Sequence, residues 1–507
     1  MKIFTKVISA AFALALPAAA SANWGTYESP STLYGLDKSV AGLHTAKTPD
    51  GKMYASWLQW SEQKGWGYDL HLQLFDENGM PMWDEESLAV ETYRNASWTA
   101  AYSLVVAPNG DAILSWADAR SEEYAESAQA HEPVLYRINQ QQEYVWGDEG
   151  LTFGPEFKFP PVLYMFGGNL WAVLIGAGDY DPYKVARIKD DGSFAIQPEE
   201  FHRNLIPCEG SDFIAIYNDS QGTVAMRYDR NLVPVWKTPA VVSEYMYSGY
   251  GTDPYNTKPD GQGGFAITFA RALNFSHLPV VQHVSGDGEA TFGPSFDVVP
   301  EDEVVGDLDY PVVGINPESE SIFCAWNHYG SGSASVSAQL IDYFGESEWG
   351  DMGKDLVSKK APSGYAYGPI DVEPLSENEW FICYANELGW GSSELHFACV
   401  NNAGEILWDY TNGNAISITD PSFSFENGIF SITYISDEVD DDWNETYSIQ
   451  NIQFNTGNPS GVDGMRDALN AGVVEYYSID GTRSDMPRKG INIVRKADGS
   501  VSKVMVK

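Results

Sequence analysis

Aromatic side chains with polar neighbours recur in the irregular segments of this chain, and their types suit the binding of sugars. A flat ring packs on the axial C–H groups of a sugar, while nearby polar groups bond its hydroxyls. Trp66 and Trp390 stand out because each is flanked by glycines, where a core role is least expected. The candidate ligand-binding residues are Trp66, Tyr68, Tyr102, Asp118, Arg120, Tyr180, Tyr250, Arg271, His328, Tyr329, Tyr367, Trp390 and Trp443.

Each of these residues also has a structural interpretation, which the sequence leaves open. Loop aromatics can pack between neighbouring sheets. Asp118 and Arg271 end predicted strands, where they either line a channel mouth or bond the backbone of the next loop. Asx residues commonly do the latter, so we favour it for these strand ends.

The sequence singles out no catalytic residue. A glycosidase needs two carboxylates about 5–10 Å apart, and among 71 acidic residues no particular pair can be named. There is no nucleophile elbow and no H-E-x-x-H motif. A binding protein is therefore favoured over an enzyme.

No cofactor or metal site is predicted. Residues 437–445, DEVDDDWNE, offer carboxylates to calcium but lack the glycine and alternating ligands of an EF-hand loop. A solvated acidic loop is the simpler interpretation. No CxxC or His-rich spacing indicates zinc.

The charge of the chain restricts its partners. Thirty Lys and Arg residues against 71 Asp and Glu give a net charge of −41. A general nucleic-acid binder needs a basic surface, so that class is excluded, and adsorption to an anionic membrane is disfavoured.

The elements that must position these residues are strands in a repeat. Each unit has an apolar run, a tight glycine turn, a second run, a variable polar loop, a third run, another tight turn and an aromatic residue. Residues 68–74 alternate apolar and polar side chains, the period of a strand. Pairs such as Asn109-Gly110 and Asn78-Gly79 predict two-residue hairpins with positive φ at both positions.

The aromatic residue that follows the second tight turn of each unit marks one repeat, and we call these residues the aromatic markers. They are Trp24, Trp83, Trp146, Phe194, Trp236, Phe292, Trp349 and Trp408. Eight markers predict an all-β, eight-bladed β-propeller, with seven blades as the alternative if the short third and fourth units merge. Because residues 420–455 supply three strands and no final marker, we expect the N-terminal strand, with Trp24 in it, to complete the last blade.

The propeller would present two different faces. Tight turns fall on one, which we name the tight-turn face. The loops between second and third strands, and the connections between blades, share the other, the long-loop face. Long loops on a rigid scaffold are where binding usually occurs, so the predicted ligand site is the long-loop face.

The ends of the chain predict export. Residues 1–22 have a basic start, an apolar run and an Ala-Ser-Ala site, the pattern of a secretory signal peptide. The propeller is expected over 23–460, a linker over 461–472 and a C-terminal β segment over 473–507. No uninterrupted apolar stretch is long enough for a membrane span. The segment 473–507 has a charge of +3, whereas residues 1–472 sum to −44.

Two resemblances to known families follow. YSIDGTR at 477–483, PRKGINIV at 487–494 and the final KVMVK look like the C-terminal sorting signal of type IX secretion cargo. The W-x-D-x-R pattern at 116–120 and the QLFDENG hairpin at 73–79 resemble propeller repeats of secreted Bacteroidota proteins. The resemblance implies delivery to the outer-membrane surface or the medium by the type IX machinery. The alternative for the tail is a structural cap.

The chain holds four cysteines, and Cys383 and Cys399 flank one predicted hairpin. They either form a cross-strand bridge or remain two core thiols, and we favour the thiols. Three function classes remain: a surface propeller that binds glycan or protein, which we favour, a glycan-cleaving hydrolase or lyase, and a structural or interaction component of the cell surface.

Overall fold

The structure is a computed structural model of the 507-residue chain. It describes residues 24–36, 38–61, 67–83, 87–91, 102–118, 120, 132–154, 156–176, 183–197, 204–208, 210, 212–245, 256–273, 276–293, 296–330, 332–360, 367–389, 392–412, 419–439, 445–457, 473–478, 483–484, 490–496 and 501–506.

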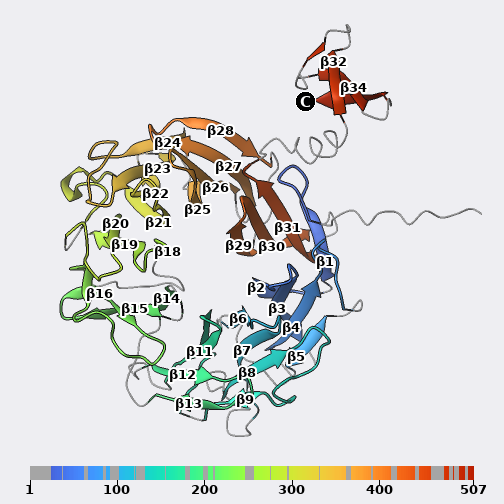
Figure 1. Ribbon diagram of the computed structural model, residues 1–507, viewed down its shortest axis with the longest axis vertical. Helices are drawn as coiled ribbons and strands as arrows, with labels where there is room; N and C mark the ends of the chain where they lie inside the picture. Colours follow the sequence, from blue (N-terminus) through green and yellow to red (C-terminus); the bar gives the residue numbers. More distant parts are fainter. Residues whose placement is uncertain are drawn as a thin grey trace, which may run out of the picture.

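Eight antiparallel sheets form a ring around a central axis, which confirms the predicted all-β, eight-bladed propeller (Figure 1). In the first seven blades the strand that comes first in the chain lies nearest the centre, whereas in the eighth blade β29 lies nearest the centre and β1 lies at the rim. The short third and fourth units form separate sheets, so the seven-bladed alternative is wrong.

The first four blades each have four strands. Their bounds are β2 (Val40–Lys47), β3 (Met53–Ser61), β4 (Gly67–Phe75) and β5 (Leu88–Glu91); β6 (Ser103–Val106), β7 (Ala112–Asp118), β8 (Glu132–Ile138) and β9 (Leu151–Thr152); β10 (Val162–Phe166), β11 (Asn169–Leu174), β12 (Lys184–Ile188) and β13 (Phe194–Ile196); β14 (Asn204–Pro207), β15 (Phe213–Asp219), β16 (Gly222–Tyr228) and β17 (Ala240–Ser243).

The remaining blades complete the ring. They contain β18 (Asn256–Pro259), β19 (Phe265–Leu273) and β20 (Ser276–Val284); β21 (Asp307–Asn316), β22 (Ser321–Gly330), β23 (Ser333–Asp342) and β24 (Lys354–Lys360); β25 (Tyr367–Ser376), β26 (Glu379–Gly389), β27 (Ser392–Asn401) and β28 (Ile406–Thr411); β29 (Thr419–Glu426), β30 (Ile429–Val439), β31 (Glu445–Asn455) and β1 (Ser31–Leu36). In the three-stranded fifth blade, single bridges such as Val280–Asp297 replace the fourth strand, and a short 3₁₀ turn, Glu301–Glu303, follows.

The N-terminal strand closes the ring, as predicted. β1 pairs with β31, so the eighth blade joins strands from both ends of the propeller. The closing strand is not the segment around Trp24, however. Trp24 precedes β1, and its neighbour Gly25 accepts a hydrogen bond from the backbone of Gln453 in β31 (3.0 Å).

The core lies between blades. Neighbouring sheets contribute to shared clusters of buried apolar side chains, for example Leu58 and Leu72 of the first blade with Leu114 and Trp116 of the second. The middle strands are buried on both sides: every residue of β7 is buried. This explains why the middle strands read as nearly continuous apolar runs.

The aromatic markers act as latches between blades. Five marker indoles each donate a hydrogen bond from Nε1 to a backbone carbonyl in the last tight turn of the next blade: Trp24 to Glu77 (2.8 Å), Trp83 to Gln140 (3.0 Å), Trp146 to Asp190 (3.0 Å), Trp236 to Gly286 (2.9 Å) and Trp349 to Asn402 (2.9 Å).

The same contact explains the glycine of those turns. A Cβ added to Gly288 would lie 2.6 Å from the Trp236 ring, and one on Gly79 would lie 3.0 Å from Trp24. Both glycines also have positive φ. In these two turns glycine is needed both for the backbone and for the ring of the preceding blade. The turn that receives Trp83 has no glycine, and Gln142 adopts the positive φ there (66°).

The predicted turn type needs a correction. Positive φ at both central residues holds only for Gly167-Gly168 and Asn427-Gly428. In turns such as 76–80 the glycine alone has positive φ, and Asp76 Oδ1 accepts hydrogen bonds from the backbone of Asn78 and Met80 (2.9 and 2.8 Å). In these longer turns the Asx side chain accepts the hydrogen bonds that a backbone carbonyl accepts in a two-residue hairpin. An Asn-Gly or Asp-Gly pair alone does not distinguish the two turn types.

The C-terminal segment forms a separate sheet outside the ring (Figure 1). Its strands are β32 (Val473–Ser478), β33 (Arg483–Ser484), β34 (Gly490–Lys496) and β35 (Val501–Val506), in the order β33-β32-β34-β35. Within the described residues, no helix has the length and apolar character needed to cross a membrane.

The cysteines are all thiols. Cys383 lies opposite Phe397 and Cys399 lies opposite Phe381, so the two are offset along the β26–β27 pair, and no bridge forms. Both are fully buried, and Cys383 belongs to the core cluster between the last two blades.

Candidate functional site

The structure describes many of the strand ends from which the loops of the long-loop face begin. Second strands end there, third strands begin there, and each blade connects to the next there, as the order of strands in every blade requires. Tight turns such as 48–52 and 76–80 lie at the opposite ends of the strands. The predicted candidates can therefore be assessed where these strand ends are described.

Asp118 and Arg120 form an ion pair at the end of β7. Arg120 donates from Nε to Asp118 Oδ1 (2.8 Å) and from Nη2 to Asp118 Oδ2 (2.7 Å), and Nη1 bonds the carbonyl of Glu149 (2.6 Å). Asp118 is fully buried. This two-point pair holds the loop base against the neighbouring strand, so the W-x-D-x-R pattern has a structural role here.

Arg271 has a similar arrangement in the fifth blade. Its guanidinium makes a two-point pair with Asp297 (2.8 and 2.7 Å), bonds Glu301 (2.7 Å) and lies 4.2 Å from the centre of the Tyr245 ring. These bonds raise the pKa of Arg271 further above its usual range. Both arginines predicted on this face are thus engaged with carboxylates of the protein itself.

Two predicted tyrosines pack within the first two blades. Tyr102 is 5% exposed, and its hydroxyl donates to the carbonyl of Gly42 (2.6 Å). It belongs to the core instead of facing a ligand, because its ring fills the space beside Trp116. Tyr68 is partly buried and meets Trp60 edge to face, with ring centres 5.4 Å apart.

His328 and Tyr329 lie at the end of β22, on the predicted face. His328 Nε2 is 2.9 Å from the carbonyl of Val305, and Tyr329 pairs with Asp307 across the β21–β22 ladder. The side chains of the other predicted candidates lie outside what the structure describes. They are Trp66, Tyr180, Tyr250, Tyr367, Trp390 and Trp443. Of these residues, only Tyr367 is described at all, as the first residue of β25.

The acidic segment proposed for calcium is described only at its ends. Asp437 and Glu438 lie in β30, opposite Tyr447 and Thr446 of β31, and residues 440–444 lie outside the described residues.

Tyr310 is the most exposed aromatic residue among the large apolar side chains on the described part of this face. It is 69% exposed and has a φ of 51°. Positive φ is unusual for a bulky residue and marks a local constraint. The β21–β22 register shifts between Asp309 and Val312, so Tyr310 and Pro311 form a bulge that turns the ring outward.

Polar groups surround Tyr310. Asp309 Oδ1 accepts a hydrogen bond from the Tyr310 backbone (2.8 Å). The charge of Asp309, then burial, and then Asp307 and Glu387 raise the pKa of the Tyr310 hydroxyl. The hydroxyl therefore stays protonated at neutral pH and remains a hydrogen-bond donor.

His277, Asp307 and Asp309 form a cluster beside Tyr310 whose ligand atoms lie within 4.8 Å of one another. Asp307 Oδ1 lies 2.9 Å from His277 Nδ1 and accepts a bond from its backbone nitrogen (2.8 Å). These contacts account for the cluster without an ion, and we assign no metal to it.

A pair of carboxylates lies on the inner strand β25. Asp371 and Glu373 both bind Lys258 of β18, the former at 2.9 Å, although the two strands belong to the fifth and seventh blades. Burial raises the pKa of Glu373, against the lowering effect of Lys258. Lys258 thus joins the fifth and seventh blades at their inner strands.

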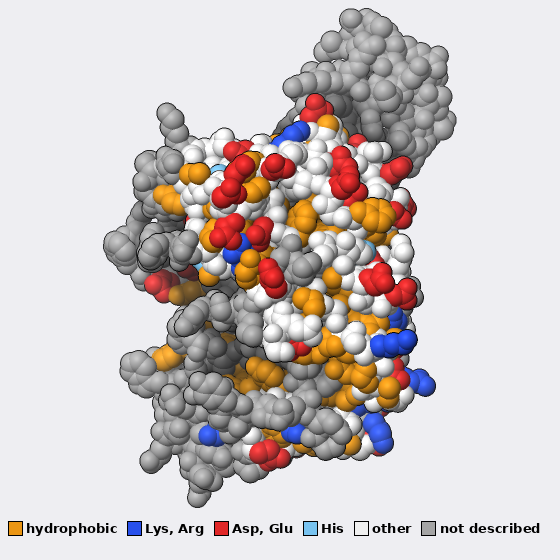
Figure 2. Space-filling model, turned by 90° about the vertical axis from the view of Figure 1, so that its left-hand side faces the viewer, with side chains coloured by type: hydrophobic (Ala, Val, Ile, Leu, Met, Phe, Trp, Pro, Cys, Tyr) orange, Lys and Arg blue, Asp and Glu red, His pale blue; other side chains and the backbone are white. Residues whose placement is uncertain are grey.

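Acidic side chains outnumber basic ones on the side of the ring shown in Figure 2, with apolar side chains between them.

Sequence reasoning missed Tyr310, because DYPVVGIN reads as part of a strand. The available signal was Pro311, since proline within a strand indicates an edge or a bulge.

No known protein family and no curated protein matches the chain. Among solved structures, the Dos1 propeller is similar over 83% of this chain and 95% of its own, at 9% identity and a TM-score of 0.45. An ulvan lyase of polysaccharide lyase family PL25 is similar over 78% and 96%, at 9% identity and a TM-score of 0.40. The propeller domain of a trilobed protease from Pyrococcus furiosus is similar over 74% and 99%, at 10% identity and a TM-score of 0.35. What these proteins bind or cleave says nothing about this chain.

Proposed function

We propose that this protein binds a neutral polysaccharide on the long-loop face of the propeller, with the Tyr310 ring as a stacking surface. The observation that carries the proposal is the exposed ring of Tyr310 on its β21 bulge, next to Asp307 and Asp309. A sugar ring stacked there has its C–H groups on the tyrosine and its hydroxyls near carboxylate oxygens, which accept hydrogen bonds strongly.

The charge pattern supports a neutral ligand. Arg120 and Arg271 each bind carboxylates of the protein, so neither offers its charge to an acidic sugar. A net charge of −41 also repels polyanions. Each stacking contact contributes about 0.5–1.5 kcal/mol, so useful affinity requires several sugar units bound along the face.

Binding and cleavage are separated by one pair of assays. The full chain is screened on an array of neutral and acidic glycans, and each bound glycan is then incubated with protein and tested for new reducing ends. We expect saturable binding to a neutral glycan and no new ends. New ends would identify an enzyme, and exclusive binding of acidic glycans would contradict the ligand class.

Trp66 and Trp390, which the sequence pattern assigns to the long-loop face, provide a second test. Replacing both by alanine is expected to weaken glycan binding at least about tenfold, equal to 1.4 kcal/mol, and to leave the melting temperature unchanged. Unfolding of this double variant would instead assign both residues to packing.

We further propose that the chain is exported and that residues 473–507 address it to the cell surface by the type IX route. The separate sheet formed by β32–β35 and its positive charge support a module distinct from the propeller. A chain ending at Gly461 is expected to fold and remain in the periplasm. Detection of that shortened protein at the cell surface would refute the sorting role.

A further inference from the structure

A cavity of about 180 Å³ lies between the second and third blades, on the tight-turn face and away from the proposed glycan surface. At about 30 Å³ per water molecule, it has room for about six waters, the size of one sugar ring or a small organic acid. Its wall includes Arg137, Trp146, Arg187, Lys189 and Asp190. Three cations at one cavity are notable in a chain with 30 basic and 71 acidic residues.

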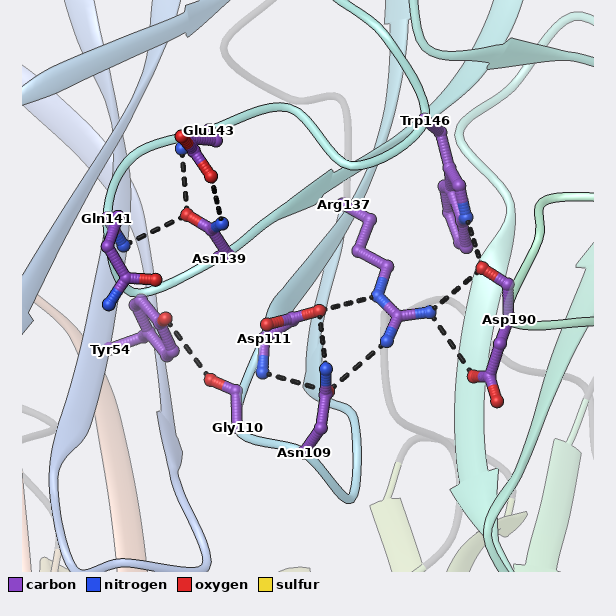
Figure 3. A network of polar contacts seen from close by, with 10 residues as sticks. All are labelled: Tyr54, Asn109, Gly110, Asp111, Arg137, Asn139, Gln141, Glu143, Trp146 and Asp190. Atoms are coloured by element: carbon purple, nitrogen blue, oxygen red, sulfur yellow. Dashed lines mark hydrogen bonds and ion pairs between the residues drawn. The ribbon is translucent and has the colours of Figure 1, made fainter.

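Arg137 forms a fixed wall of the cavity (Figure 3). It is 6% exposed, and its Nε donates to Asp111 Oδ2 (2.8 Å). Nη1 donates to the carbonyl and to Oδ1 of Asp190 (both 3.2 Å), and Nη2 donates to Asn109 Oδ1 (3.2 Å). The carbonyl of Asp190 also accepts the Trp146 indole N–H, so this network fixes the ring at the cavity edge. Two carboxylates compensate the charge of Arg137.

Arg187 and Lys189 differ from Arg137. Within the described residues, neither has a carboxylate within ion-pair distance, and Arg187 bonds the neutral amide oxygen of Asn169. Asp190, the acid next to Lys189 in the chain, is bonded to Arg137 through Oδ1 (3.2 Å). The next acid, Asp191, uses Oδ1 to accept bonds from Ser193 (2.9 and 2.6 Å). Both cations are exposed and line the cavity.

We propose that this cavity binds a small ligand that carries an oxyanion, a carboxylate, sulfate or phosphate group, through Arg187 and Lys189. The Trp146 ring at the edge offers an apolar surface to the rest of the ligand. Long-range repulsion from the acidic chain is screened beyond about 8–10 Å at physiological salt. Arg187 and Lys189 can therefore attract one anionic group locally, because within the described residues no carboxylate lies at ion-pair distance from either, and Asp190 at the cavity is engaged by Arg137. The proposal is independent of the glycan site on the opposite face.

The test measures binding of three probes to the full chain by isothermal titration at constant ionic strength: sodium sulfate, D-glucuronate and D-glucose. We expect saturable binding of glucuronate, sulfate or both, and none of glucose. Binding of glucuronate alone identifies a sugar-acid site, and binding of both identifies a general oxyanion site. Failure of both anions to bind at millimolar concentration overturns the proposal.

The double variant Arg187→Gln/Lys189→Gln is expected to weaken anion binding at least tenfold. Its matched control is Arg230→Gln/Lys237→Gln, which removes two exposed cations from the neighbouring fourth blade and changes the net charge equally. The control should bind as the wild type does. An equal loss in both variants would show a general charge effect and would overturn the site. Circular dichroism of both variants checks that the fold is intact.

Discussion

The indole Nε1 of Trp24 lies 2.8 Å from the carbonyl oxygen of Glu77, which joins the start of the propeller chain to the last tight turn of the first blade. Trp24 thereby makes for the eighth blade the contact that Trp83 makes for the first, although Trp24 precedes β1 whereas Trp83 lies between β4 and β5. The ring is closed twice, by β1 on β31 and by this latch on the first blade.

The first prediction concerns this closure. Removing residues 24–36 exposes the edge of β31 and the apolar surface that Leu33 and Leu36 cover, so the propeller should lose several kcal/mol of its unfolding free energy. Trp24→Phe keeps most of the packing and loses one hydrogen bond, about 1 kcal/mol. Urea unfolding of the three proteins measures both effects. Equal midpoints for the shortened and full chains would contradict the closure.

The second prediction concerns the pair at the end of β7. Asp118→Asn breaks a buried two-point ion pair and should cost about 3 kcal/mol of unfolding free energy, because Arg120 keeps its charge in a largely covered position. Glu149→Gln is the control, since its carboxylate is 73% exposed and 3.9 Å from Arg120, and the change should be below about 0.5 kcal/mol. Similar costs for the two variants would refute a special role for Asp118.

The third prediction is a pH dependence. Although burial alone would raise it, the pKa of Asp260 lies below its usual value, because His283 and the backbone of Gln262 and Gly264 donate bonds to its carboxylate. A carboxyl group whose pKa is lower in the folded than in the unfolded protein adds to the unfolding free energy at pH values above its unfolded pKa of about 4. This contribution disappears as the pH falls through the folded-state pKa. Asp260→Asn should therefore cost about 1–2 kcal/mol at pH 7 and progressively less below pH 4. A pH-independent difference would contradict this assignment.

The fourth prediction concerns the thiols. Burial raises the pKa of Cys324 and of Cys399 to about 12, so neither forms a reactive thiolate at neutral pH. Native protein should react with a thiol reagent only at Cys208, the partly exposed cysteine, and denatured protein should react at all four. A count of two after denaturation without reductant would reveal the Cys383–Cys399 bridge that the register excludes.

The repeat was predictable because its signals are local. Alternating strands, glycine turns and the markers Trp83 and Trp146 all describe single blades, and stacking such units has one simple outcome, a ring. Trp24 indicated that the N-terminus closes the ring, but the strand that pairs with β31 begins several residues later, at Ser31. A marker residue specifies the contact with the turn of the next blade, and it does not specify which nearby residues form the strand.

The candidate site was less predictable, because exposure depends on contacts between distant segments. Tyr102 reads as a loop aromatic, yet its ring and hydroxyl complete the packing beside Gly42. Tyr310 reads as a strand residue, yet the Pro311 bulge turns it into solvent. Asp118 was expected to bond the backbone of the next loop, and its Oδ1 accepts a hydrogen bond from the backbone nitrogen of Arg120 (3.1 Å). Its pairing with the Arg120 guanidinium depends on side-chain geometry that the sequence pattern does not specify.

Glycan binding at Tyr310 is tested by the affinity of the Tyr310→Ala variant for its ligand. The ligand is the neutral glycan that binds best on the array, and the method is isothermal titration. The control is Phe344→Ala, which removes a ring that is 76% exposed in the same blade but lies in the opposite tight turn. We expect at least about tenfold weaker binding for Tyr310→Ala and unchanged binding for Phe344→Ala, with equal melting temperatures. Wild-type affinity in Tyr310→Ala, or an equal loss in both variants, would contradict glycan binding at Tyr310.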